Sequence, residues 1–295
     1  MVSVWLIRLV LLALLAVLVT LYGRGWQQLR RAGSPLAKPM RLSFLFSSIA
    51  LLLLATFPPL YTRSHELLYA RAMQKIMVAM VAAPLFWLAC PLHFMLRGLP
   101  FAWRRQFMRS LRTDTATGQL LRGATSTGVA WMLYVTAIVI WHDPSVVNWT
   151  MDGMSRHYLT LMLMFGAALL YWVHIVGTGF HLRNALPGWV LFAYAVGVEI
   201  PNMTAGITIA YSGTPLYAHY VTTHQQLALG MIEDQITAGG LVWFMGSVVF
   251  FFSAVMIVNR IFIRHGSTAP EYHPDWDSEE RMIAPGLEHR LDEKR

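Results

Sequence analysis

The stretch ITAGGLVWFMGSVVFFFSAVMIVN, residues 236–259, contains no charged side chain. An α-helix rises about 1.5 Å per residue, so about 20 predominantly apolar residues are enough to cross the hydrocarbon core of a bilayer. This stretch therefore predicts a transmembrane helix at about 236–260, close to the carboxyl end of the chain.

Similar apolar runs recur along the rest of the chain, separated by charged, Pro-containing or Gly-containing stretches. They lie at about 2–22, 42–62, 68–92, 124–141, 157–176 and 188–211. The composition agrees, because 56% of the 295 residues are hydrophobic, only 13% are charged, and the mean hydropathy is +0.48. We predict an all-α, polytopic membrane bundle of seven transmembrane helices over residues 1–263. Residues 264–295 are rich in charge and proline, which predicts a disordered tail.

The distribution of basic residues predicts the orientation. A net charge of +8 would suggest a nucleic-acid partner in a soluble protein, but here the basic residues gather in the connections after the first and third runs. They are Arg24, Arg30, Arg31, Lys38 and Arg41 in the first, and Arg97, Arg104, Arg105, Arg109, Arg112 and Arg122 in the second. Loops of this kind face the cytoplasm. With seven spans, the amino terminus is then outside and the tail cytoplasmic, and we expect membrane lipid and no nucleic acid as a partner.

Enzyme motifs are missing from the sequence. The single cysteine, Cys90, cannot form an intrachain disulfide or supply a paired thiolate metal site. There is no phosphate-binding loop, no Gly-x-Ser-x-Gly elbow and no His-Glu-x-x-His motif. We expect no catalytic activity.

Histidine and methionine residues gather at the predicted outward ends of the helices. They are His65, His142, His157, His219, His224, Met73, Met151, Met154 and Met231. Imidazole and thioether groups are ligands that copper prefers. One hypothesis is an outward copper site; the other is that these side chains only pack at helix ends and interfaces.

Two groups of polar residues fall inside apolar runs. Glu199 lies in the middle of a run and is followed by Pro201 and Asn202. A carboxyl at this depth is costly unless it is paired, hydrated or neutral, so it indicates a proton or ion path, a contact with a partner, or a structural hydrogen bond to Asn202. Arg71 and Lys75 share one helix face. They could anchor the helix by reaching the headgroups, or bind an anionic group such as a haem propionate or a lipid phosphate.

Several segments resemble one protein family in order and spacing. The first is ARAMQKIMVAMVAAP, residues 70–84, followed by Pro91-Leu92 and Arg97-Gly98-Leu99. The others are Trp141-His142-Asp143-Pro144, His157 with Trp172, Pro215-Leu216-Tyr217, and Asp234-Gln235-Ile236-Thr237-Ala238-Gly239 with Trp243 and Gly246. Together they resemble the CtaG-type cytochrome c oxidase assembly family over about residues 5–260. The resemblance implies a seven-span protein of the bacterial cytoplasmic (inner) membrane that helps to assemble a haem-copper oxidase.

The chain also departs from the family pattern. The third span of the family normally carries His-x-x-x-His where this chain has Arg71 and Lys75, and a second histidine of the fifth span is replaced by Leu161. The candidate copper ligands are therefore His142 and His157, which match the pattern, and His65 from the outward set. The cation pair favours a docking or structural role instead.

Asp234 and Gln235 are expected to open the last helix, where a carboxylate can cap backbone N–H groups. Our leading hypothesis is an assembly factor or accessory subunit for a cytochrome c oxidase or another copper membrane enzyme. The alternative is a transporter or channel for copper, protons or another ion that uses Glu199 and Asn202. A third hypothesis is a membrane oxidoreductase that uses haem; against it, the spans lack the paired histidines usual for haem b.

Overall fold

The computed structural model describes residues 2–111, 115–178, 186–223 and 230–266, and all regular elements in these ranges are helices. They are α1 (Val2–Arg31), α2 (Pro39–Thr56), α3 (Leu60–Glu66), α4 (Leu68–Lys75), the π-helix η1 (Ile76–Ala82), α5 (Ala83–Leu88), α6 (Pro91–Gly98), α7 (Phe101–Ser110), α8 (Ala116–Ala124), α9 (Thr127–His142), α10 (Pro144–Met151), α11 (Met154–Val176), α12 (Gly188–Tyr211), α13 (Ala218–Thr223) and α14 (Met231–Gly266). The predicted all-α class is confirmed. The tail was predicted to begin at residue 264, but α14 continues to Gly266; the rest of the predicted tail, from residue 267 onward, lies outside the described residues.

Six helical segments in the described ranges are long and apolar enough to cross a membrane. They are α1, α2, the continuous α4–η1–α5 segment, α11, α12 and α14. The predicted fourth span corresponds to α8 and α9, which are bent by 51° at a short break and make a seventh span if they are counted together. The prediction of seven spans therefore depends on this bent pair.

Two spans end earlier than the sequence predicts, whereas α1 and α14 extend beyond their predicted runs, to Arg31 and over Met231–Gly266. The second span was predicted to reach residue 62, but α2 ends at Thr56 because Pro58 and Pro59 have no backbone N–H to continue the helix. The third was predicted to reach residue 92, but it ends at Leu88, since Cys90 adopts a left-handed φ of 52° and Pro91 starts α6. After the break at Pro58 and Pro59, the chain continues as the separate short helix α3.

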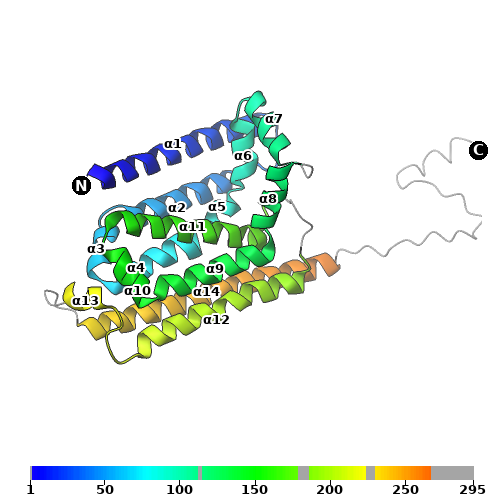
Figure 1. Cartoon of the computed structure of the whole chain (residues 1–295). Helices are drawn as coiled ribbons and strands as arrows, with labels where there is room; N and C mark the ends of the chain where they lie inside the picture. The colour runs from blue at the N-terminus through cyan, green and yellow to red at the C-terminus, as the bar shows by residue number, and fades with distance from the viewer. Residues whose placement is uncertain (1, 112–114, 179–185, 224–229, 267–295) are drawn as a thin grey trace, which may run out of the picture.

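The helices form a bundle with α1 along one edge and with α12 and α14 side by side along the other (Figure 1). The amino terminus, α3, α10 and α13 gather at one end, which we call the α13 end. The opposite end holds α6, α7 and α8, and the two basic connections lie there. The bundle thus separates the predicted outward and cytoplasmic loops; which end faces the cytoplasm remains a prediction.

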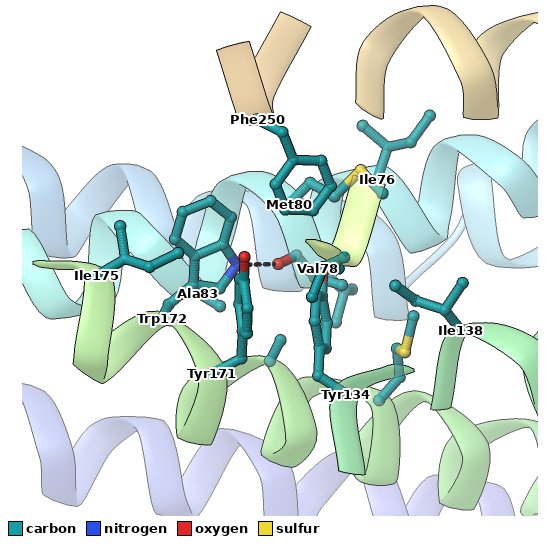
Figure 2. Close-up of a cluster of buried hydrophobic side chains, with 14 of the residues drawn as sticks. Ile76, Val78, Met80, Ala83, Tyr134, Ile138, Tyr171, Trp172, Ile175 and Phe250 are labelled. Carbon is teal, nitrogen blue, oxygen red and sulfur yellow. Dashed lines mark hydrogen bonds between the residues drawn. The ribbon is translucent and has the colours of Figure 1, made fainter. Parts of the chain in front are cut away.

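Aromatic side chains fill the centre of the bundle (Figure 2). Tyr134 of α9 stacks on Tyr171 of α11, with 4.5 Å between ring centroids. Trp172 stacks on Phe250 of α14 at 6.1 Å, and its indole Nε1 donates to the carbonyl of Ala79 in η1 at 2.8 Å. Large aromatic contacts with a satisfied indole stabilise a core strongly. This core holds α9, α11 and α14 around η1.

Candidate functional site

A buried lysine connects three helices near the α13 end. Lys75, the last residue of α4, is only 1% exposed. Its Nζ lies 2.9 Å from Nε2 of His142 and 3.3 Å from Oδ1 of Asn202 on α12. The His142 Nδ1 lies 2.8 Å from the carbonyl of Ile138 and must donate to it, which leaves Nε2 as an acceptor for the ammonium. The metal-binding lone pair of His142 is therefore already used by Lys75.

The same polar chain continues to α14. Asn202 donates through Nδ2 to the carbonyl of Val242 at 3.1 Å and to the Glu199 carboxylate at 3.5 Å. The hydroxyl of Ser247 donates to the other Glu199 oxygen at 2.6 Å. A Cβ at Gly246 would collide with the side-chain amide of Asn202, so this position must be glycine for the amide to fit. We call the connected side chains the Lys75 network: Lys75, His142, Asn202, Glu199 and Ser247.

Two histidines form a separate pair close to the α13 end. His157 of α11 is fully buried, and its Nδ1 lies 2.9 Å from Nε2 of His65 on α3. Its Nε2 donates to Oε1 of Gln74 at 3.0 Å, so Nδ1 is the acceptor and His65 the donor. The ring of Tyr61 stacks on His157 at a centroid distance of 4.8 Å. We call His65 and His157 the outer histidine pair.

Arg71 is buried one turn before Lys75, with 2% of its surface exposed. Its guanidinium carbon lies 4.7 Å from the centroid of the Trp141 ring, and Nη1 lies 3.9 Å from the sulfur of Met151. Nη2 is buried without a hydrogen-bond partner. Neither Arg71 nor Lys75 forms an ion pair with a carboxylate in the described part of the chain. The interpretation of the two as headgroup anchors is wrong, because both side chains point into the bundle.

The acidic motif of the last helix caps a different helix. We expected Asp234 to cap its own helix, but α14 already begins at Met231. The buried Asp234 carboxylate instead accepts hydrogen bonds from the backbone N–H groups of Leu68 and Tyr69, at 2.7 and 2.8 Å, in the first turn of α4. Asp234 thus fixes the start of the helix that carries Arg71 and Lys75.

The neighbouring motif residues hold the other side of α14. Gln235 accepts from the N–H of Leu216 at 2.9 Å and donates to the carbonyl of Thr214 at 3.0 Å, which ties down the segment after α12. Gly239 lies where α14 crosses α12, and Trp243 follows it one turn later with its side chain 38% exposed. The main chain and Cβ of Trp243 also lie against Gly206 of α12, so both motif positions belong to the close crossing of α12 and α14.

A comparison with protein families identifies the family to which the chain belongs. A family model described as cytochrome c oxidase caa3 assembly factor (Caa3_CtaG) matches residues 20–263. The chain belongs to this family. No curated protein and no solved structure matches the chain. The match runs from residue 20, within α1, to residue 263, within α14, and includes the Lys75 network and the outer histidine pair.

The candidate copper ligands do not form one cluster in this family member. His65 and His157 lie together, whereas His142 belongs to the Lys75 network. Within the described ranges, no three His, Cys, Asp or Glu side chains are arranged to hold a metal ion. His219 donates to the backbone carbonyl of His65 at 2.9 Å, and His224 lies outside the described residues. A copper site stays a prediction.

Two polar residues of these sites were missed by the sequence analysis. Gln74 links His157 to α2 through the carbonyl of Ala55, and Ser247 completes the Lys75 network. An uncharged polar side chain in an apolar run is a weak signal, since serine is common in membrane helices. The position of Gln74 between Arg71 and Lys75 was the stronger clue, because it places three polar side chains within five residues.

Acidification is expected to destabilise the folded protein, because the imidazole of His65 becomes protonated more easily in the unfolded state. His65 lies outside the spans. Burial, assisted by His219 and Arg71, lowers the pKa of the His65 imidazole from 6.5 to about 4. Between these values the unfolded state binds more protons, so the free energy of unfolding decreases as the pH falls from about 6.5 to 4. After solvent screening we expect a loss of about 1–2 kcal/mol.

Thermal unfolding in detergent at several pH values measures this loss. His65→Gln keeps an N–H donor for His157 but cannot titrate in this range. The difference between the wild-type and variant profiles isolates His65 from the other histidines. Parallel profiles for the two proteins would contradict the assignment.

Proposed function

We propose that the chain is a membrane assembly factor for a haem-copper cytochrome c oxidase, and that it acts by binding membrane-spanning subunits of that enzyme in the bacterial cytoplasmic membrane. The observation that carries the proposal is the family match over residues 20–263. The charges of the site favour binding over metal delivery. Lys75 already donates to His142, and the buried Arg71 adds a second positive charge one turn away, which opposes a further cation.

The proposal is tested by deleting the gene. The deletion strain should lose most of its assembled oxidase, measured as haem absorbance and cytochrome c oxidation in membranes, and the wild-type gene should restore it. Unchanged haem content, copper content and activity in the deletion strain would reject the assembly role.

A copper-carrying role is the finer version of this function, and the outer histidine pair fits it best. Both imidazoles present nitrogen atoms to one another at 2.9 Å. Metal–imidazole bonds are about 2 Å long, so a copper ion between them requires the two nitrogens to separate to about 4 Å. His65 lies on the short helix α3, so this separation requires a shift of α3 relative to α11.

Metal analysis of the purified protein after loading with Cu(I) tests this role. If the outer pair binds copper, His65→Ala and His157→Ala should each lose nearly all bound copper, whereas His142→Ala should retain it because Lys75 occupies that ring. Copper that is lost in His142→Ala but kept in His65→Ala would place the site in the Lys75 network instead. Copper at background level in the wild type would restrict the function to binding.

Proton or ion transport is the second candidate function. The observation that favours it is the Lys75 network, which runs without interruption from α14 to α9 across the bundle and includes a midspan carboxyl. Vesicles containing the purified protein should then show a proton or copper flux that Glu199→Gln abolishes. Equal flux in protein-free vesicles would reject transport.

A further inference from the structure

A groove along the outer side of α12 and α14 ends at the carboxyl of Glu199. It has a volume of about 710 Å³. Apart from Glu199, Ser247 and Asn259, its walls are apolar; they include Phe192, Val196, Phe251, Val255 and Phe262. The pair of helices that forms it lies at an edge of the bundle (Figure 1). In a membrane, this groove would open toward lipid or toward another protein.

The depth of the carboxyl decides what the groove can hold. Glu199 lies near the middle of α12 and opposite Ser247 near the middle of α14, so it sits close to the centre of the bilayer. Its side chain is only half-buried. Ser247 and Asn202 each donate one hydrogen bond to the carboxyl, at 2.6 and 3.5 Å, which leaves further acceptor positions on its exposed side. Ionisable groups at this depth are expensive unless such positions meet polar groups, and lipid acyl chains supply none. A groove filled by lipid would therefore leave part of the carboxyl facing hydrocarbon.

The length of the groove also fits a helix. From Ser247 to Phe262 it follows 16 residues of α14, which places its two ends about 22 Å apart along the helix. A neighbouring transmembrane helix can place apolar side chains along the phenylalanine walls and one donor at the level of Glu199. Hydrogen bonds between helices in lipid contribute both association energy and specificity.

We propose that this groove binds a transmembrane helix of a client subunit, and that the helix carries a basic or other hydrogen-bond-donating side chain at mid-membrane depth opposite Glu199. The proposal rests on the assembly function proposed above and names the surface that performs it. Because Glu199 is bonded to Asn202 and through it to Lys75, the client helix would contact the Lys75 network directly.

Photocrosslinking in native membranes tests the groove. The photoreactive amino acid benzoylphenylalanine replaces Phe251, which lines the groove and is 64% exposed. The matched control replaces Phe252, which is 63% exposed but lies outside the groove. We expect Phe251 to crosslink to a membrane-spanning peptide, identified by mass spectrometry, that has a donor side chain at the depth of the crosslink. Phe252 should give little of this product.

The Glu199→Gln background supplies the second readout. Glutamine keeps the size of the side chain and an oxygen for Ser247, so the bundle should fold, but the charge is lost and the Phe251 product should fall several-fold. Crosslinks to lipid alone, equal products from Phe251 and Phe252, or a yield unaffected by Glu199→Gln would each overturn the proposal. Oxidase content in the deletion strain is measured separately, so failure of the groove is distinguishable from failure of the assembly function.

Discussion

Replacing Asp234 with alanine is expected to lower the thermal unfolding temperature by about 5–10 °C. The carboxylate accepts the backbone N–H groups of Leu68 and Tyr69 in a fully buried position. Alanine leaves both donors without a partner where water cannot replace it, and each unsatisfied donor costs about 1–3 kcal/mol. The loss also removes a negative charge from the positive end of the α4 dipole. Thermal unfolding of the detergent-purified variant measures the effect.

Glu233→Ala is the matched control for this variant. Glu233 precedes Asp234 on the same helix, but its side chain is exposed, and among the described residues it bonds only to the nearby Gly230 N–H, so its removal should change the unfolding temperature by little. Asp234→Asn keeps one acceptor oxygen and should lie between the two. If Asp234→Ala and Glu233→Ala unfolded at the same temperature, the interhelical cap would not contribute to stability.

This cap illustrates what the sequence could and could not predict. Hydrophobic run length gave the long spans, because the bilayer sets a minimum length that any spanning helix must satisfy. The sequence also marked Asp234 as a helix-capping residue. It could not show that the capped helix is α4, since the contact joins residues 166 positions apart. Local capping rules apply to the residue's own helix, and this carboxylate serves another.

For Arg71 and Lys75, too, the sequence could not show which distant residues they contact. Spacing correctly placed Arg71 and Lys75 on one helix face, but whether that face meets lipid or the bundle depends on packing. The acceptors that make burial of Lys75 feasible come from α9 and α12, far away in the sequence. The interpretation as anchors followed the general behaviour of lysine and arginine near span ends. It was wrong because polar groups of α9 and α12 replace headgroup solvation for Lys75, while the Arg71 guanidinium packs over the ring of Trp141.

Replacing Gly239 with alanine is expected to destabilise the bundle by about 1–3 kcal/mol despite the higher helix propensity of alanine. A Cβ at this position would lie 2.5 Å from both the backbone nitrogen of Ala210 and the carbonyl oxygen of Gly206. Both atoms belong to the main chain of α12 and cannot rotate away, so the two helices must separate. Small residues permit this close approach in membranes, where packing is the main force between helices.

Gly240→Ala is the matched control, because it adds the same methyl group one residue further along α14. A Cβ on Gly240 meets nothing within 4 Å, so Gly240→Ala gains the same helix propensity without the collision and should be neutral or slightly stabilising. The difference between the two unfolding temperatures therefore isolates the cost of separating α12 from α14. Equal temperatures would show that the helices can part freely at this crossing.

Gly239→Ala should also disturb the hydrogen bonds of the Lys75 network. Asn202 lies one turn from Gly206 on α12, and its amide donates to the carbonyl of Val242 on α14 at 3.1 Å. Moving α12 outward stretches this bond and shifts the neighbouring Glu199 carboxyl away from Ser247. We therefore expect Gly239→Ala, but not Gly240→Ala, to reduce the Phe251 crosslink as well as the stability. A destabilised Gly239→Ala protein with an unchanged crosslink would separate the helix crossing from the binding groove.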